Sequence, residues 1–308
     1  MAEPLSFKAA MEFAYGEPRE LSPGVVRFVA NNPSPYTYKG TNSYLIGTRS
    51  LALIDPGPED APHLAAIMKA AGDRKITHIV LTHTHRDHID GLPAALKATG
   101  AKTAGFGSYP LVSEVAERTG PGGEGSHTDR NWQPDIVLKD GGRLQGEDWA
   151  LDAIHTPGHT PDHLAFSLSQ PGGLPDVLFT GDHIMAWNTS VIAPPEGRLG
   201  DYLESLEKIM SRTETVAYPG HGGQFDNPAR VARAYLVHRR MRDASILECI
   251  KGGVDSVDGV VAQVYRGLDE RLIGAAALSV LAHVEHLSER ALIRASSPLS
   301  RSSVLSAV

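Results

Sequence analysis

Six consecutive residues, His83-Thr84-His85-Arg86-Asp87-His88, constrain this chain most, because they place three histidines and an aspartate directly after an apolar segment. Residues 76–81 are almost entirely apolar and predict a buried strand. Alternate residues of an extended chain point to the same side, so the first two histidines can reach one ion together. The last two residues of the motif lie where the chain must turn, and they can face a second ion. Zinc-type sites use nitrogen and oxygen ligands, so the motif predicts a metal centre at a strand end.

Three further residues offer ligands at the ends of other predicted strands. They are His159 in Thr156-Pro157-Gly158-His159-Thr160, Asp182 in Thr180-Gly181-Asp182-His183, and His221 in Pro219-Gly220-His221-Gly222. Each ligand follows a glycine, which lets the backbone approach a site closely. Together with the first motif, these residues give enough donors for two metal ions.

The spacing of apolar residues predicts a layered α/β architecture for residues 25–217. Strands are predicted at residues 25–30, 42–47, 50–54, 76–81, 149–154, 164–169, 177–180 and 215–217, and helices at residues 61–71 and 92–99. Residues 105–146 are rich in glycine and proline, so we predict a long loop there, and loops of that length are usually functional.

The sequence pattern changes after Pro228. Long helical spacing over residues 229–250 is followed by predicted helices at residues 257–266 and 273–287. We therefore predict a metal-binding catalytic domain of residues 1–225 and a small helical domain of residues 226–308. Residues 295–308 are rich in serine, and we expect them to be frayed.

Composition and charge exclude several classes of protein. The single cysteine, Cys249, rules out a disulfide within the chain, and 29 basic against 36 acidic residues give a net charge of −7. Such a chain has no global attraction for nucleic acid or anionic lipid. Charged residues interrupt residues 1–20, so no signal peptide fits, and no apolar stretch reaches the roughly 18 residues of a membrane span. We expect a cytoplasmic protein without membrane contact.

The ordered series His-x-His-x-Asp-His, Gly-His, Gly-Asp and Gly-His resembles the metallo-β-lactamase superfamily, and the resemblance spans most of residues 42–222. It implies an αβ/βα four-layer sandwich that holds two divalent metal ions at one edge of its sheets. Zinc is the expected metal, with manganese or iron as alternatives. Carried over to this chain, the first ion would be bound by His83, His85 and His159, the second by Asp87, His88 and His221, and Asp182 would bridge both.

The same resemblance implies a hydrolase in which the two ions activate a bridging hydroxide. Asp87 would be the catalytic residue that orients this hydroxide or carries its proton. Asp55 matches a strand-end aspartate that supports the ligand loop, and its alternative role is that of a turn or helix-capping residue. His155 and His163, which flank His159, and His183, which could face the substrate, are further supporting candidates. We expect His78 to be structural and His63, His127, His238, His283 and His286 to be surface or packing residues.

Two residues narrow the class of hydrolase. True metallo-β-lactamases generally lack the bridging carboxylate that Asp182 would supply, so antibiotic hydrolysis is disfavoured. Flavodiiron oxidoreductases of this fold carry glutamate where this chain has His85, so oxygen or nitric oxide reduction is disfavoured too. The C-terminal helices resemble the winged-helix-like tail of the β-lactamase-like protein 2 group, which includes an endoribonuclease.

Three functions stay open on the sequence alone. The first is hydrolysis of an ester, thioester or related bond in a small-molecule substrate. The second is cleavage of single-stranded RNA, for which residues 227–251 offer six basic and two acidic residues on one helix. The third is a non-catalytic metal-dependent sensor or DNA-binding regulator. A homodimer formed through the C-terminal helices is also possible on this reading.

Overall fold

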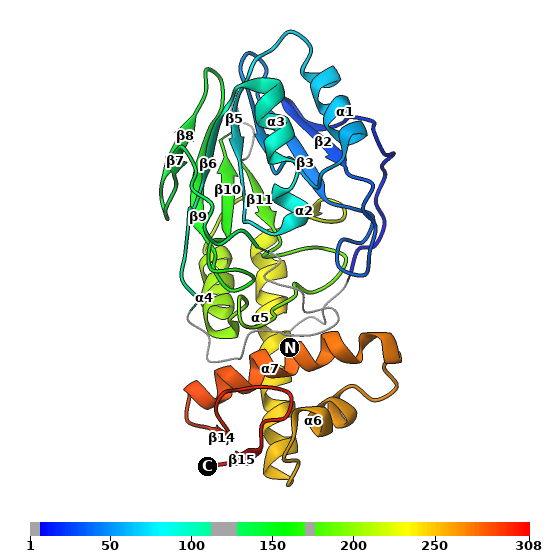
Figure 1. Cartoon of the computed structure of the whole chain (residues 1–308), viewed down its shortest axis with the longest axis vertical. Helices are drawn as coiled ribbons and strands as arrows, with labels where there is room; N and C mark the ends of the chain where they lie inside the picture. The colour runs from blue at the N-terminus through cyan, green and yellow to red at the C-terminus, as the bar shows by residue number, and fades with distance from the viewer. Residues whose placement is uncertain (1–6, 112–127, 170–175) are drawn as a thin grey trace.

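Two β-sheets pack face to face in the upper part of the computed structural model as drawn in Figure 1, and the structure describes residues 7–111, 128–169 and 176–308. The first sheet has seven strands in chain order: β1 (Arg19–Ser22), β2 (Val25–Val29), β3 (Asn42–Ile46), β4 (Leu51–Ile54), β5 (Ile76–Val80), β6 (Lys102–Gly105) and β7 (Ile136–Val137). The second has six, ordered β13 (Phe225–Asp226), β12 (Val216–Pro219), β11 (Val177–Gly181), β10 (Leu164–Leu168), β9 (Ala150–His155) and β8 (Arg143–Gln145).

Helices cover the outer face of each sheet. On the first sheet lie α1 (Ala61–Ala71) and α3 (Leu92–Thr99), whose apolar sides share a buried cluster with β4 and β5. On the second lie α4 (Leu199–Met210) and the first half of α5 (Pro228–Lys251), with Tyr202 and Leu206 buried against β11 and β12. A separate apolar core fills the space between the sheets. The predicted αβ/βα four-layer sandwich is confirmed.

The two sheets are joined by hydrogen bonds at the edge where the predicted ligands lie. Leu164 N donates to Thr82 O across 2.7 Å, and Asn42 N donates to Gly220 O across 2.7 Å. The Asn42 side chain also donates to the carbonyl oxygens of Pro219 and Gly222. These contacts join the end of β5 to the start of β10, and the start of β3 to the end of β12, although the joined residues are far apart in the sequence.

Helices α1 and α3 have the bounds that the sequence predicts, because both end at a glycine and α1 also begins at a capping aspartate. The Asp60 side chain accepts a hydrogen bond from His63 N at the start of α1. Gly72 and Gly100 follow the last helical residues with positive φ angles, and each donates its N–H back to the last turn.

Several elements were not predicted. They include β1, β6, β13, α4 and the short helix α2 (Arg86–Ile89), together with β7 and β8 inside the segment expected to be a loop; residues 112–127 of that segment lie outside the described residues. Helix α4 buries Leu199, Tyr202, Leu206 and Ile209 on one side. That spacing is helical, so the pattern was present in the sequence and was missed. The short strands β7 and β8 carry too few residues to show an alternation.

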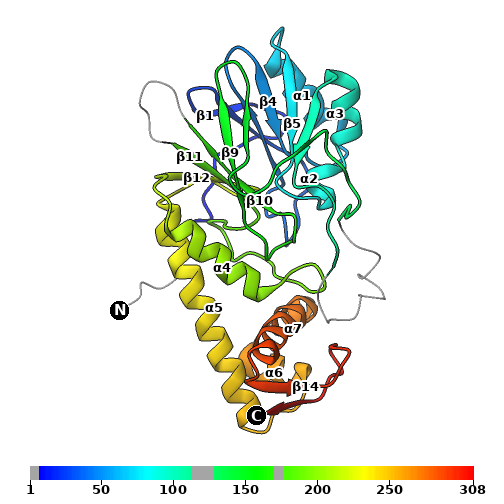
Figure 2. The same ribbon diagram turned by 90° about the vertical axis from the view of Figure 1, so that its left-hand side faces the viewer.

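The C-terminal part contains the second half of α5, α6 (Val257–Val264), the 3-10 turn Glu270–Leu272, α7 (Ile273–Glu289) and the strands β14 (Ile293–Ala295) and β15 (Leu305–Ala307). Figure 2 shows α5 running out of the sandwich into this part, with α7 between α4 and α6. Because α5 contributes to the cores of both parts, the boundary between residues 225 and 226 stays a prediction.

The expectation that residues 295–308 are frayed is wrong. Strands β14 and β15 pair antiparallel, with Ile293 opposite Ala307. Leu299, Ser303 and Leu305 are buried, and the two leucines join the apolar core formed by α5, α6 and α7. Serine content alone was a poor guide, because the apolar residues between the serines pack against the helices.

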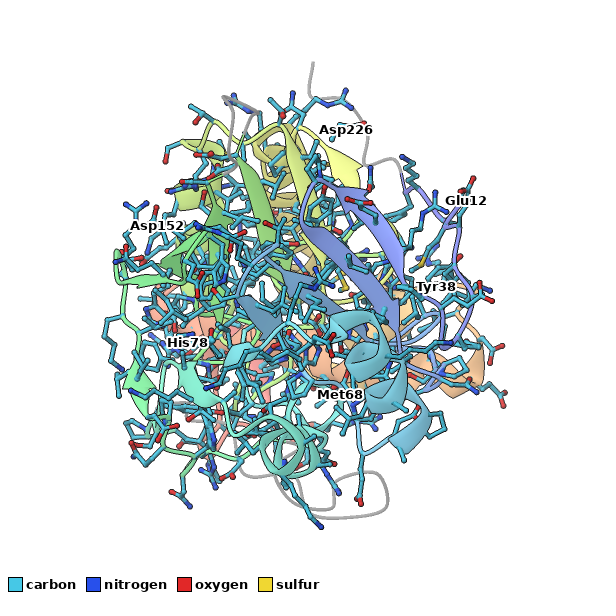
Figure 3. All side chains as sticks on the ribbon, turned by 90° about the horizontal axis from the view of Figure 1, so that it is seen from above. Glu12, Tyr38, Met68, His78, Asp152 and Asp226 are labelled. Carbon is cyan, nitrogen blue, oxygen red and sulfur yellow. The ribbon has the colours of Figure 1, made fainter. Side chains whose placement is uncertain are left out.

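The N-terminal segment crosses the surface on the β1 side of the sandwich. Seen from above, Glu12 and Tyr38 lie on one side of the molecule, away from His78 and Asp152 (Figure 3). Lys8 N donates to Ala186 O across 2.8 Å. Among the described residues, we find no helix whose length and apolarity would let it cross a membrane.

Candidate metal centre

All seven predicted ligands come together at the edge where the two sheets meet. Nitrogen and oxygen atoms of His83, His85, His159 and Asp182 form one group, and those of Asp87, His88 and His221 form a second. Within each group every pair of these atoms lies within 4.8 Å. The first histidines follow β5, Asp87 and His88 lie in α2, and the remaining ligands follow β9, β11 and β12.

Asp182 lies between the two groups. Its Oδ2 is 3.1 Å from His221 Nε2 and 3.6 Å from His159 Nε2, and its Oδ1 is 3.6 Å from His88 Nε2. In the first group, His85 Nδ1 is 2.9 Å from both His83 Nε2 and His159 Nε2. One carboxylate therefore faces ligands of both groups.

The outward-facing ring nitrogens of the histidines fix their tautomers. Nδ1 of His88 contacts Asp55 Oδ2 at 2.9 Å, Nδ1 of His159 contacts Val191 O at 2.6 Å, and Nδ1 of His221 contacts Gly40 O at 3.3 Å. Carbonyl and carboxylate oxygens only accept hydrogen bonds, so each Nδ1 carries a proton. When these rings are neutral, each Nε2 directs a lone pair into the cluster.

This convergence of lone pairs fits metal ions. His88 Nε2 and Asp182 Oδ1 are both buried and have no hydrogen-bond partner in the part of the chain that the structure describes. Buried polar atoms are rarely left unpartnered, and lone pairs that face one another repel. A divalent cation between these two atoms would bind both lone pairs, which gives each atom a partner and removes the repulsion. Imidazole with carboxylate is a donor set that such ions accept.

The pKa values of the histidines shift in opposite directions in the two ligand groups. Burial lowers the pKa of His83 well below its usual value and that of His159 to about 4, so both are neutral donors at pH 7. Burial also acts on His88 and His221, but the neighbouring aspartates outweigh it and raise the pKa of both histidines. The same histidines hold the pKa of Asp182 well below its ordinary value despite its burial, so this carboxylate is ionised.

Asp55 supports the ligand loop and does not cap a helix. Its Oδ1 accepts from Thr82 N at 2.8 Å, and its Oδ2 accepts from Thr82 Oγ1 at 2.7 Å and from His88 Nδ1 at 2.9 Å. The residue adopts a left-handed backbone conformation, with φ at 50°, immediately after β4. The helix cap is Asp60 instead.

The other supporting candidates differ in what they contact. His163 Nε2 accepts from the backbone N of Asp182 at 3.0 Å, so it positions a predicted ligand. His155 Nε2 contacts Pro161 O at 2.8 Å and stabilises the turn that carries His159. His183 is fully buried, and its ring packs edge-on against Tyr202 at 4.9 Å. The expectation that His183 faces the substrate is therefore wrong.

The remaining histidines lie away from the two ligand groups. His63 and His283 are buried and bonded to Ser43 and Asp243, and His78 packs edge-on against Trp149. His238 and His286 are half-buried in α5 and α7, whereas His127 lies outside the described residues. Packing roles fit the described members of this set.

Glycine is required where the ligand strands approach most closely. A Cβ atom at Gly220 would lie 2.2 Å from Asp182 Oδ1, and one at Gly158 would lie 2.4 Å from the Tyr202 Cα. Any larger residue before His221 or His159 would therefore displace a predicted ligand.

Sequence reasoning missed three polar residues beside the cluster. Thr41 Oγ1 donates to Asp87 Oδ2 at 2.8 Å, and Asp162 Oδ2 accepts from Thr84 Oγ1 at 2.8 Å. Glu196 Oε2 lies 3.7 Å from the outward nitrogen of His85. The first two adjoin recognisable motifs and could have been singled out, but the segment around Glu196 carries no signal of its own.

A sandwich of two sheets between helices, with a His/Asp cluster compatible with metal binding at its edge, defines a class of metal-dependent hydrolases. The model of the metallo-beta-lactamase superfamily matches residues 36–221, and that of the beta-lactamase associated winged helix domain matches residues 256–298. This chain belongs to the metallo-beta-lactamase superfamily and is a hydrolase with a C-terminal winged-helix domain. Members of this superfamily bind divalent metals.

The chain is similar to curated proteins over most of its length. It is 31% identical over 289 residues to a beta-lactamase-like protein 2 homolog of Drosophila melanogaster, covering 90% of this chain and 91% of the relative. It is 31% identical over 232 residues to an atrochrysone carboxyl ACP thioesterase of Emericella nidulans, covering 74% of this chain and 65% of the relative. The expected resemblance to the β-lactamase-like protein 2 group is confirmed.

Solved structures confirm the fold. A beta-lactamase domain protein from Burkholderia ambifaria superposes with a TM-score of 0.78 at 19% identity, covering 99% of this chain and 97% of that one. A metallo-beta-lactamase family protein from Thermus thermophilus superposes with a TM-score of 0.71 at 23% identity, covering 94% of this chain and 100% of that one.

Proposed function

We propose that this chain is a binuclear metal-dependent hydrolase that cleaves a thioester or ester bond in a small-molecule substrate. The observation that carries the proposal is the pair of ligand groups whose lone pairs converge around Asp182. His83, His85 and His159 would hold one ion, and Asp87, His88 and His221 the other. We propose zinc for both, because the donors are mainly imidazole nitrogens.

Divalent ions bound here would lower the pKa of a water molecule and polarise the carbonyl group under attack. Asp87 is the most exposed of the seven ligands, with 28% of its side chain accessible, so it faces the substrate side. Although burial opposes it, His88 and His221 lower the pKa of Asp87, which keeps its carboxylate ionised. The Thr41 hydroxyl holds Asp87 Oδ2, so the carboxylate is positioned to accept the proton of the attacking water.

The thioester preference has two supports. The first is the similarity to the thioesterase of Emericella nidulans, which acts on a carrier-protein thioester by its name. The second is Glu196, whose side chain lies beside His85, one of the more accessible ligands. A carboxylate at that position is compatible with a neutral thioester carbonyl but repels the phosphodiester backbone of RNA.

Three of the six basic residues that favoured the endoribonuclease alternative make contacts within the chain. Arg239 is buried and donates to Ser190 O, Arg240 pairs with Glu207 at 2.8 Å, and the Arg242 guanidinium lies over the Tyr265 ring. These basic residues of α5 therefore serve packing or intramolecular pairing. A helix used in this way is a weak surface for binding phosphates.

The DNA-binding alternative has little support as well. In a helix-turn-helix arrangement α7 would be the helix that enters the major groove. Instead, α7 buries residues along most of its length, and Glu289 at its end pairs with Arg198 before α4 at 2.6 Å. A surface that packs against the catalytic domain is not available to read base edges.

The test is metal content followed by turnover on the same sample. We expect about two zinc ions per chain, hydrolysis of an acyl thioester, and no cleavage of single-stranded RNA. Asp87→Ala and Asp182→Ala should abolish turnover while the circular dichroism spectrum stays unchanged. Asp152→Ala, which removes a partly exposed carboxylate paired with Arg143, is the matched control and should keep full activity.

Full activity in either Asp87→Ala or Asp182→Ala would refute the two-metal mechanism. Cleavage of RNA that falls steeply with salt would establish the endoribonuclease instead. Gel filtration with light scattering on the same sample tests the proposed homodimer.

A further inference from the structure

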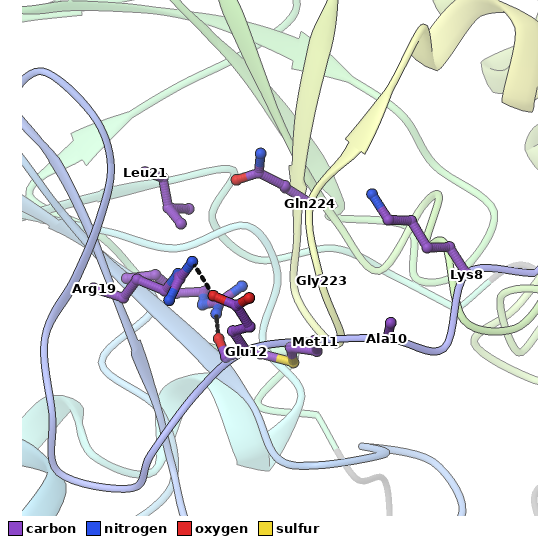
Figure 4. Close-up of a pocket in the computed structure, with 9 residues that line it drawn as sticks. Lys8, Ala10, Met11, Glu12, Arg19, Leu21, Gly223 and Gln224 are labelled. Carbon is purple, nitrogen blue, oxygen red and sulfur yellow. Dashed lines mark hydrogen bonds and ion pairs between the residues drawn. The ribbon is translucent and has the colours of Figure 1, made fainter.

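A cavity of about 290 Å³ lies beside the N-terminal segment, at the β1 end of the sandwich. Its wall combines the cations Lys8, Arg19 and Arg27 with one carboxylate, Glu12, and with apolar atoms of Met11 and Leu21. Figure 4 shows Arg19 and Glu12 close together on one side, with Leu21 and Gln224 across from them. Three cations and one carboxylate leave a local excess of two positive charges, in a chain whose net charge is −7.

Arg27 is the unusual member of this wall. Its side chain lies in β2 and the residue is only 3% exposed. Nη2 donates to the Glu12 carbonyl oxygen at 2.7 Å, but Nε is buried without a partner, and Arg27 forms no ion pair with a described residue. The Glu12 carboxylate pairs with Arg19 instead, at 2.5 Å.

A guanidinium in this state is expected to have an anionic partner. Buried charges in proteins are normally paired, because removing an ion from water is costly without compensation. Burial lowers the pKa of Arg27, and the neighbouring Arg19 adds to this effect, so the charges on this wall disfavour one another. A bound anion would relieve both the desolvation and the repulsion.

The cavity adjoins the loop that carries His221. Gly223 and Gln224 line it, two and three residues after that predicted ligand. A Cβ atom at Gly223 would lie 3.2 Å from Ala10 O, so the N-terminal segment packs directly on the loop. A ligand in the cavity therefore contacts the same loop that completes the metal centre.

We propose that this cavity is an anion-binding subsite that takes a phosphate or carboxylate group through the Arg27 guanidinium. The planar fork of arginine binds both groups through paired hydrogen bonds, and Lys8 and Arg19 add positive charge. Met11 and Leu21 give the subsite an apolar side, which suits an anion attached to an organic body. The anion comes either from free solution or from a phosphorylated substrate, and the second source rests on the proposed thioesterase function.

The first experiment measures binding of inorganic phosphate by calorimetry to the metal-loaded protein, with sodium chloride at matched ionic strength as reference. Arg27→Met keeps approximately the side-chain length and removes the charge. Because Arg27 forms no ion pair with a described residue, the substitution breaks no ion pair among the described residues. We expect phosphate affinity to fall about tenfold or more in Arg27→Met. Arg143→Met, which removes an exposed arginine of β8, should bind phosphate like the parent protein.

The metal centre is a second place where phosphate could bind, so Asp182→Asn is titrated in parallel. Binding that persists in Asp182→Asn and is lost in Arg27→Met supports the subsite. Absence of phosphate binding to the parent protein, or equal binding by the parent and Arg27→Met, would overturn it. None of these titrations depends on turnover, so a failure of the proposed thioesterase function leaves them interpretable.

The second experiment identifies the source of the anion. It compares kcat/KM for an acyl-coenzyme A thioester, which carries phosphates, with kcat/KM for the N-acetylcysteamine thioester of the same acyl group, which carries none. If the substrate supplies the anion, Arg27→Met lowers the ratio of these constants about tenfold, and Arg143→Met leaves it unchanged. An unchanged ratio with lost phosphate binding supports a subsite for a free anion.

Discussion

Replacing Asp55 by asparagine tests how the second layer of residues prepares the metal centre. In the native chain, Asp55 Oδ2 accepts hydrogen bonds from His88 Nδ1 at 2.9 Å and from Thr82 Oγ1 at 2.7 Å. Asparagine can keep Oδ1 on Thr82 N, but it places an N–H donor where Oδ2 stood. His88 Nδ1 must then lose its proton to accept that donor, and the proton moves to Nε2, which faces the predicted metal position.

The size of the effect follows from these contacts. Outer residues that orient metal-binding histidines typically contribute 10- to 100-fold to metal affinity, so we expect a loss of about 1.4–2.7 kcal/mol in Asp55→Asn. The hydrogen bond that Thr82 Oγ1 donates to Asp55 Oδ2 is also lost, because an N–H group cannot accept it. This loss lowers the free energy of unfolding of the metal-free protein by about 1.5–3 kcal/mol. Backbone strain does not contribute, because asparagine tolerates the positive φ of Asp55.

The assay is competition for zinc against a chromophoric chelator, combined with urea unfolding of the metal-free protein. Asp60→Asn is the matched control, because asparagine caps α1 as well as aspartate does. It should leave both metal affinity and stability unchanged. Zinc affinity of Asp55→Asn equal to that of the parent protein would refute the tautomer argument.

Three further predictions address the proton acceptor, the C-terminal hairpin and pH. Thr41→Val removes the hydrogen bond to Asp87 and should lower kcat/KM about tenfold and move the acidic limb of the pH profile upward, whereas Thr41→Ser should keep both near the parent values. Leu305→Ala should lower the free energy of unfolding by about 2–4 kcal/mol in urea, because Leu305 is buried; no change would mean that the segment is frayed after all. Burial lowers the pKa of His63 to about 4 from 6.5, so the unfolded chain binds more protons between these values, and stability present above pH 6.5 is lost as the pH falls towards 4. His63→Gln should remove about 2.4 kcal/mol of that acid-induced loss, measured as the difference between urea unfolding at pH 7 and pH 4.5; an unchanged difference would contradict the assignment.

The parts of the fold that were predictable are those whose signals are local. Helix α1 is bounded by a capping aspartate and a terminal glycine, and strand β5 is a short, mostly apolar segment, so neighbouring residues determine both. The hairpin of β14 and β15 was not predictable in this way. Leu299 and Leu305 are isolated among serines, and their burial depends on helices that lie earlier in the chain.

The residues of the candidate site also differ in whether a local motif makes them predictable. Residues 83–88 and the three glycine-flanked ligands are recognisable because each lies in a short motif at a strand end. Glu196 has no such motif. It lies 3.7 Å from His85 only because the chain between β11 and α4 returns to the ligand edge, and that return is set by packing of α4 on the second sheet.

The burial of Arg27 is a second feature that the sequence does not predict. Arg27 shares its side of β2 with Val25 and Val29, which are both buried, so the strand alternation places a cation on an otherwise apolar side. The residue is buried because the N-terminal segment, held by Lys8 and lying on Gly223, covers that side of the strand. A buried cation created by two segments distant in the sequence can be recognised only in the folded chain. Sites of this kind therefore come from searching a structure for charges without partners, whereas the ligands of a metal centre can be found by searching the sequence for motifs.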